Sequence, residues 1–235
     1  MTKDASEPEL ITAEFARQWW KLLMANAVAL VEDAALLASH DSAGRAQSLI
    51  VLAMEELAKA RWLYEEAEYE WTAPLGLYGS RPRPAGEVAV PEGLRSVRRP
   101  HSEKLKAAEQ FASGLAGFWD LEKRMDYYLR PELKAFEATA KERNLDKQAG
   151  FYVDRTGDRI LSPLAIPVAD VTPAIRRTAK VIQMHLIEDH TRQQDSPDES
   201  LIDSAEDLHW AVMPYSDPEL FADFVDRISA DDKAE

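Results

Sequence analysis

The chain has 235 residues, 46% of them apolar, no cysteine and a formal net charge of −14. This composition supports a sizeable core and excludes a disordered chain, disulfides, thiolate metal sites and a cysteine nucleophile. The acidity argues against nucleic-acid binding by the whole surface, so no DNA partner is expected. The sequence starts without signal-peptide features and has only short aliphatic runs, so we expect a soluble cytoplasmic protein with no membrane partner.

Residues 1–11 are predicted to be a flexible polar leader, and a helix is predicted from about residue 12 to residue 39. One broad face of this helix carries Asn26 and Asp33 among apolar residues. We expect both side chains to be buried, either in a structural polar network or in a site. The turn that follows is short, so the first two helices should be antiparallel neighbours.

The helix predicted for residues 44–71 places Glu55, Glu56, Lys59 and Arg61 within an apolar run. Glu55 and Lys59 have the spacing of an intrahelical ion pair, which is worth about 0.2–0.5 kcal/mol. Glu56 lies between leucines on its stripe, where a carboxylate is costly unless it is paired. These charges therefore form either a structural polar network or part of a functional site.

Residues 72–100 are rich in proline and glycine and have no regular period, which predicts a long irregular loop. The loop is locally basic within an acidic chain. Its arginines are candidate RNA-binding residues, although solvated loop charges are the simpler interpretation. They are Arg81, Arg83, Arg95, Arg98 and Arg99.

A third helix is predicted to begin at about His101 and to continue to about residue 129. His101 and Lys104 project from its first turn on the same side as its apolar stripe. The helical pattern resumes at residues 131–144. Aromatic and β-branched residues around a Thr-Gly turn then predict one small β-hairpin within residues 149–163.

The remainder of the chain is also helical in pattern. One helix is predicted for residues 173–192, and two shorter ones for residues 202–213 and 218–230. Residues 199–235 hold eleven Asp or Glu against two Lys or Arg. We therefore predict a mostly α, up-and-down helical bundle over residues 12–193, followed by an acidic helical extension over residues 194–235.

Four segments together resemble the AbiV family of bacterial abortive-infection proteins. They contain Asn26 with Asp33, the run 53–60 with its two glutamates, His101 with Lys104, and the run 150–154. The resemblance implies a HEPN-like bundle. It also implies an anti-phage function, in which the protein arrests phage propagation by shutting down translation.

Many HEPN proteins are metal-independent ribonucleases that use an Arg-x(4–6)-His pair, usually at a dimer interface. Here Arg95 precedes His101 at that distance, but Pro100 between them breaks a shared helix. Our hypothesis is a variant catalytic site, with His101 as acid and base and Lys104, Lys59 or Arg95 as the cation at the phosphate. The residues expected to orient these groups are Glu56, Asp33 and Asn26.

Two other interpretations remain open. A non-catalytic protein would use the same polar cluster to stabilise the bundle and would bind a phage protein or the translation machinery. A carboxylate-bridged metal bundle would draw on Glu32, Glu55, Glu56, His185, Glu188 and His190, but such a bundle normally needs two Glu-x-x-His pairs, and the sequence does not have two. We therefore expect no cofactor, RNA or a phage-encoded protein as the partner, and a homodimer.

Overall fold

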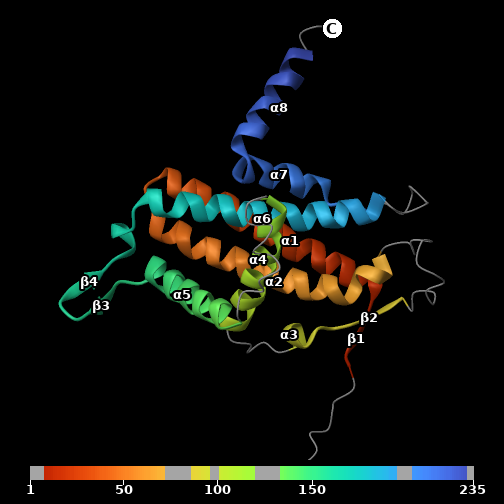
Figure 1. Ribbon diagram of the computed structural model, residues 1–235, viewed down its shortest axis with the longest axis horizontal. Helices are drawn as coiled ribbons and strands as arrows, with labels where there is room; N and C mark the ends of the chain where they lie inside the picture. The colour runs from red at the N-terminus through yellow and green to blue at the C-terminus, as the bar shows by residue number, and fades with distance from the viewer. Residues whose placement is uncertain (1–7, 72–85, 96–100, 120–132, 195–202, 232–235) are drawn as a thin grey trace, which may run out of the picture.

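The computed structural model describes residues 8–71, 86–95, 101–119, 133–194 and 203–231. Its architecture is a mostly α bundle, as the sequence predicts. Three long helices lie side by side and form its body: α1 (Ala13–Ser39), α2 (Ala43–Trp71) and α6 (Val168–Gln194) (Figure 1).

The first two helices match their predicted ranges. α1 begins at an N-cap, where the Thr12 hydroxyl accepts a hydrogen bond from the backbone N–H of Phe15. α1 and α2 are joined by a turn in which Asp41 adopts a left-handed φ of 58°, a conformation that Asp tolerates better than most residues. The short turn makes them antiparallel neighbours.

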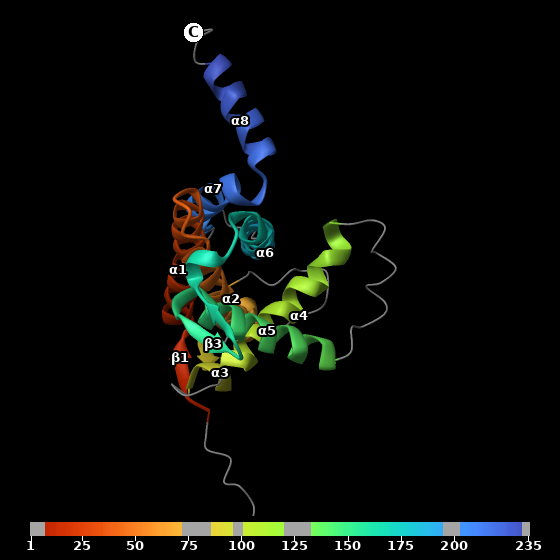
Figure 2. The same ribbon diagram turned by 90° about the vertical axis from the view of Figure 1, so that its left-hand side faces the viewer.

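Helices α4 (His101–Trp119) and α5 (Leu133–Phe151) lie side by side and project from the body of the bundle (Figure 2). Both pack against α2 at the end nearer the body. α5 continues seven residues beyond its predicted end, so Gly150 and Phe151 belong to this helix and not to the hairpin. The hairpin itself is shorter than predicted and consists of β3 (Asp154–Thr156) and β4 (Arg159–Leu161).

A second pair of strands was not predicted. β1 (Leu10–Thr12) lies at the end of the expected leader and pairs antiparallel with β2 (Glu87–Ala89) from the expected irregular loop. The short helix α3 (Glu92–Arg95) follows β2. Hydrogen bonds between β1 and β2 therefore give regular structure to part of the expected leader and part of the expected loop. The two segments are far apart in the sequence, so a local pattern cannot predict their pairing.

The C-terminal part begins with a short 3₁₀ helix, η2 (Pro163–Ala165), and then α6, which starts five residues before the expected Pro173. α7 (Glu206–Ser216) packs on α6 and α1. α8 (Pro218–Asp231) extends away from the body of the bundle (Figure 1).

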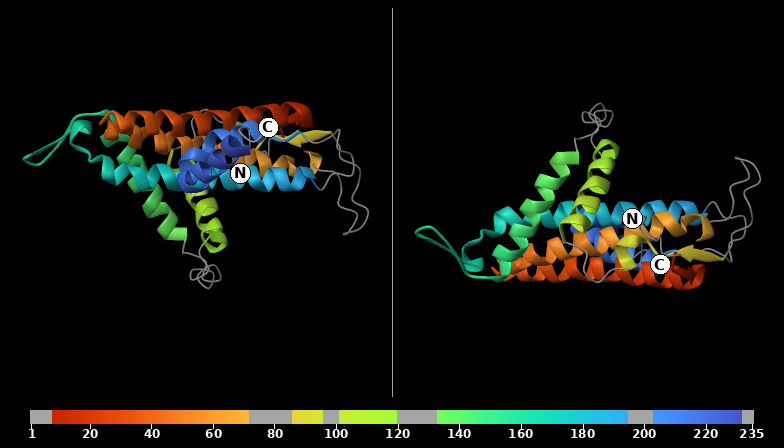
Figure 3. Two further views of the ribbon diagram at one scale, coloured as in Figure 1. Left: turned by 90° about the horizontal axis from the view of Figure 1, so that it is seen from above. Right: turned by 90° about the horizontal axis from the view of Figure 1, so that it is seen from below.

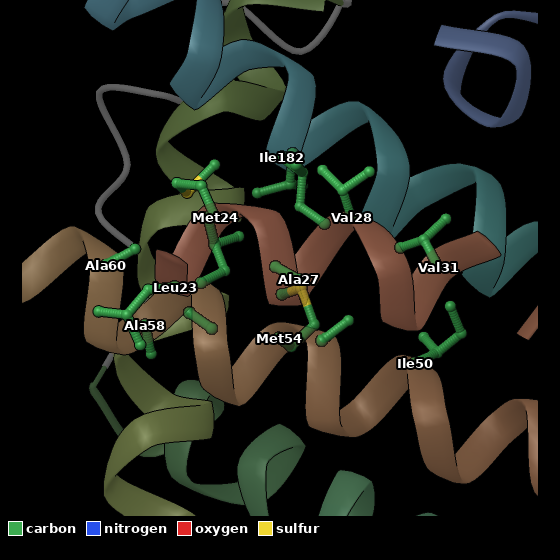
Figure 4. Close-up of a cluster of buried hydrophobic side chains, with 14 of the residues drawn as sticks. Leu23, Met24, Ala27, Val28, Val31, Ile50, Met54, Ala58, Ala60 and Ile182 are labelled. Atoms are coloured by element: carbon green, nitrogen blue, oxygen red, sulfur yellow. The ribbon is translucent and has the colours of Figure 1, made fainter. Parts of the chain in front are cut away.

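The hydrophobic core lies mainly between α1, α2 and α6 (Figure 4). Met54 of α2 lies beside Ala27 of α1, and Ile182 of α6 lies beside Val28 on another side of the cluster (Figure 4). α2 contacts α1, α4, α5 and α6, so nearly every side of it is covered. A central helix of this kind has little room for charged side chains, which makes those that it carries informative.

α1 presents a different face to the core from the one predicted. The buried face contains Trp20, Met24 and Val31, whereas Asn26 and Asp33 are exposed to solvent. The prediction that both are buried is wrong because the large apolar side chains occupy the core and the polar ones stay hydrated. By length and apolar content α1 is also long enough to cross a membrane, but its buried face packs within the bundle.

Gly150 lets α5 approach α2 closely. A Cβ atom at this position would lie 2.0 Å from the carbonyl oxygen of Gly44 and 2.2 Å from the Ser48 hydroxyl. We expect Gly150→Ala to lower the free energy of unfolding by about 1–3 kcal/mol, because backbone atoms would have to move apart. Urea unfolding measures this change. Gln148→Ala, an exposed change on the same helix, is the control, and an equal loss in both variants would contradict the tight contact.

Candidate functional site

The strongest candidate site centres on the carboxylate of Glu55, in the middle of α2. Its side chain is only 5% exposed, yet it is surrounded by two lysine ammonium groups and a histidine ring from two other helices. Lys147 Nζ lies 2.6 Å from Oε1, His101 Nδ1 lies 2.7 Å from Oε2, and Lys104 Nζ lies 3.9 Å from Oε2. A buried carboxylate is stable only with such partners, so these contacts account for its presence in the core.

The first turn of α4 supplies two of the three partners. His101 and Lys104 are three residues apart and therefore lie on one face of this helix. Leu105 and Ala108 are buried on α4 and hold its first turns against the bundle. As predicted, the side chains of His101 and Lys104 lie on the side of α4 that faces the bundle, and both contact Glu55 there.

Helix α5 supplies the third partner. The close contact at Gly150 brings this helix against α2, where the Ser48 hydroxyl donates a 2.7 Å hydrogen bond to the carbonyl of Lys147. The side chain of Lys147 then reaches Glu55, two turns further along α2. The sequence analysis missed Lys147, because nothing in the α5 pattern distinguishes it from the lysines on the surface. The docking of α5 is the only signal that selects it.

His101 is the component best suited to proton transfer. Its Nδ1 faces a carboxylate, which only accepts hydrogen bonds, so the neutral imidazole carries its proton on Nδ1 and leaves Nε2 as a base. The side chain is 56% exposed, whereas its partner Glu55 is buried. One side of the imidazole ring therefore contacts the buried carboxylate of Glu55, and the other side is open to solvent.

Glu56 and Lys59 do not join this group. Lys59 Nζ donates a 2.5 Å hydrogen bond to Glu56 Oε1 within one turn of α2, and both side chains are partly exposed. This is a local pair of the kind expected for Glu55 and Lys59, shifted by one residue. The roles predicted for the two glutamates are therefore reversed in the structure: Glu55 lies at the centre of the cluster and Glu56 makes the intrahelical pair.

The other predicted site residues lie elsewhere. Arg95 is exposed, and its Nε donates a 2.7 Å hydrogen bond to the carbonyl of Val90. Asn26 and Asp33, expected to orient the catalytic groups, are on the solvent face of α1. The remaining candidate RNA-binding arginines lie outside the described residues: Arg81, Arg83, Arg98 and Arg99.

A second buried polar cluster joins α1, α2 and α6. Arg17 Nη1 and Nη2 lie 2.7 and 2.8 Å from the two carboxylate oxygens of Asp189, a bidentate pair. Trp20 Nε1 donates a 3.1 Å hydrogen bond to His185 Nε2. The sequence analysis missed Arg17 and Asp189, although a charge at a core position of a helix was the signal that singled out Glu56.

His185 and Glu188 belong to this second cluster. His185 Nδ1 lies 3.5 Å from Glu188 Oε2, too far for a well-formed hydrogen bond. Burial opposes ionisation of Glu188, but the guanidinium of Arg61, 2.6 Å away, outweighs it, and the pKa of Glu188 is lowered to about 2. Glu188 is therefore ionised and pairs with the arginine side chains around it. Within the described ranges, no group of three or more His, Asp or Glu is arranged to hold a metal ion.

A bundle built on a central helix, with a solvent-facing histidine at its edge, is consistent with the HEPN class of helical-bundle proteins. A family model described as AbiV, of the HEPN type, matches residues 15–183, and the chain therefore belongs to the AbiV family. This membership places it among the abortive-infection proteins of anti-phage defence. Neither the comparison with curated proteins nor that with solved structures found a match.

The buried carboxylate should be more important for stability than its neighbour in the sequence. We expect Glu55→Ala to lower the free energy of unfolding by about 3–5 kcal/mol, because Lys147 would be left at a largely buried site without its partner. Glu56→Ala should cost less than about 1 kcal/mol, since it removes a partly exposed local pair. Chemical unfolding of both variants compares the two, and equal costs would contradict the central position of Glu55.

The buried histidine predicts a pH dependence of stability. Burial lowers the pKa of His185 from its ordinary value of 6.5. Below that pH the unfolded chain binds a proton that the folded chain does not, so stability falls with falling pH and is level above it. The slope that this residue contributes approaches about 1.4 kcal/mol per pH unit.

Urea unfolding between about pH 5.5 and 7.5 tests this linkage. His185→Gln should flatten the slope relative to the unmodified protein. His40→Gln, at an exposed turn, should leave the slope unchanged. A slope that is the same in all three proteins would show that His185 does not provide it.

Proposed function

We propose that this AbiV-family protein arrests phage propagation by shutting down translation through metal-independent cleavage of RNA at the Glu55–His101 site. The observation that carries the proposal is the 2.7 Å contact between a buried carboxylate and a solvent-facing imidazole, with two lysines beside them. Glu55, His101, Lys104 and Lys147 are the residues assigned to the reaction. Glu55 and Lys147 take the positions that the sequence analysis gave to Glu56 and Lys59.

The chemistry follows from the charges at the site. His101 Nε2 accepts the proton of an RNA 2′-hydroxyl, the 2′-oxygen attacks the adjacent phosphorus, and the bond to the 5′-oxygen breaks. The protonated imidazole of His101 then gives its proton to the leaving 5′-oxygen, which restores the neutral ring, and a 2′,3′-cyclic phosphate remains on the other fragment. Glu55 holds the imidazole in position and stabilises its protonated form, as the carboxylate of a catalytic triad does.

Lys104 supplies positive charge at the phosphate, a role that arginine fills in the HEPN pattern. A lysine ammonium binds phosphate as a point charge, without the two-pronged geometry of a guanidinium. Lys147, whose side chain is only 12% exposed, neutralises the buried side of Glu55. The two lysines and the one carboxylate of the cluster sum to a charge of +1, in a protein of net charge −14.

A second candidate function is the binding of a phage protein or of the translation machinery without catalysis. It is favoured by an exposed apolar surface at and around the β3–β4 hairpin. Tyr152, Val153, Ile160 and Leu164 are 68–80% exposed, an unusual density of exposed apolar side chains on so short a segment. This surface is separate from the Glu55 cluster in the sequence and can be varied independently of it.

Total RNA from phage-infected cells that produce the protein tests the proposal. We expect discrete cleavage products, and a loss of cleavage of about 10²–10⁴-fold for His101→Ala, because a general acid and base contributes that much. His40→Ala, at an exposed histidine away from the site, is the matched control and should cleave normally.

Intact RNA together with arrested protein synthesis would overturn the catalytic proposal and favour binding. In that case Ile160→Asp should abolish phage resistance, whereas His101→Ala should retain it. If both variants resist phage as well as the unmodified protein does, neither surface is responsible.

A further inference from the structure

A pocket with a volume of about 210 Å³ lies between α6 and α7, and the proposed reaction does not use it. Figure 3 shows α7 lying over α6 and α1, whereas α4 and α5, which supply the partners of Glu55, project from another side of the bundle. All the residues that line the pocket follow residue 183, where the match to the AbiV family model ends. Membership of the family therefore does not account for this pocket.

The walls of the pocket are mostly apolar. Leu186 and Ile187 come from α6, and Ala205 and Trp210 come from the N-cap and the first turns of α7. An engineered cavity of about 150 Å³ with aliphatic and aromatic walls binds benzene. The pocket here is larger, so it has room for one or two fused aromatic rings. Side chains around a cavity lack packing partners on one side, and a bound ring would supply them.

Trp210 is held in place by two neighbours. Its indole ring stacks on Phe224 of α8, with the ring centroids 4.8 Å apart and an angle of 29° between the planes. Its Nε1 donates a 3.3 Å hydrogen bond to Glu206 Oε1. An aromatic ring fixed at the wall of a pocket is well suited to stack on a flat ligand or to contact its edge.

The polar residues of the lining favour a ligand that donates hydrogen bonds. They are His190, Glu206 and His209, and no lysine or arginine is among the lining residues in the part of the chain that the structure describes. Burial, together with the neighbouring His190, lowers the pKa of His209, so its ring is mainly neutral at pH 7. A carboxylate accepts several hydrogen bonds, so Glu206 has capacity beyond the bond from Trp210. The same carboxylate would repel an anion.

We propose that the pocket between α6 and α7 binds a small aromatic molecule that carries a nitrogen hydrogen-bond donor. Its ring lies against Trp210 and the aliphatic wall, and its nitrogen lies at Glu206. An arylalkylamine and a nucleoside share this chemistry, because each combines a flat ring with N–H groups that a carboxylate accepts. The amine is also a cation, which a protein of net charge −14 attracts. This molecule is a ligand separate from the RNA substrate proposed above.

Isothermal titration calorimetry of the full chain at neutral pH tests the proposal. Tryptamine and adenosine represent the two sources of the ligand, and indole-3-acetate has the ring of tryptamine with a carboxylate in place of the ammonium group. We expect tryptamine, adenosine or both to bind with a dissociation constant below about 1 mM, and indole-3-acetate to bind at least roughly 10-fold more weakly. Binding of tryptamine alone identifies an amine site, and binding of adenosine alone identifies a nucleoside site.

Two variants locate the bound molecule. Glu206→Gln removes the charge but keeps the shape of an exposed side chain, so it should weaken the binding of tryptamine at least roughly 10-fold. Asp207→Asn makes the same change at the next residue, which is exposed and does not line the pocket, and it should bind as the unmodified protein does. Ala205→Phe fills the pocket and should abolish the binding of either probe. Circular dichroism confirms that each variant is folded.

Three results would overturn the proposal. If neither tryptamine nor adenosine binds at about 5 mM, the pocket does not take this class of ligand. If indole-3-acetate binds as tightly as tryptamine, or Glu206→Gln binds tryptamine as tightly as Asp207→Asn does, the carboxylate does not receive the nitrogen. If a folded Ala205→Phe variant binds as well as the unmodified protein, the probes bind on another surface.

Discussion

The structure depends on one constraint: α2 carries a carboxylate in its middle, although other helices cover α2 on almost every side. Glu55 lies in the middle of α2 and is nearly inaccessible to water. Its charge can be accommodated there only if cations reach it, and they come from the start of α4 and from the last turns of α5. The positions of both helices are therefore coupled to this one side chain, and so is the site at their edge.

A second set of buried charges, which includes Arg17 and Asp189, lies further along α2, and it differs from the Glu55 cluster. Arg17 and Asp189 pair within the interior, and Tyr64 packs between the aromatic rings of Trp20 and Trp71. That cluster connects α1, α2 and α6 and reaches the surface through the ion pairs of Arg17 with Asp203 and of Arg61 with Glu188. The Glu55 cluster differs from it in presenting an exposed imidazole, that of His101, and for this reason the two networks are assigned different roles.

Membership of the AbiV family is the evidence for the general function of the protein, and the geometry of the site is the basis of the proposed mechanism. The family places the protein in phage defence, whereas the imidazole–carboxylate pair supplies a chemistry that such a protein can use. In the proposed reaction, lysines take the place of the arginine of the HEPN pattern, so the phosphate would be held by charge more than by shape.

The sequence by itself determined the helical class, the limits of α1 and α2, and the presence of a small hairpin, because hydrophobic period and turn residues are local properties. It also singled out His101 and Lys104 from their place in one helical turn. Only the tertiary structure decided that Glu55 and not Glu56 faces them, that Lys147 completes the cluster, and that Asn26 lies in solvent. These outcomes depend on the rotation of each helix and on contacts between residues up to 92 positions apart, neither of which a local pattern contains.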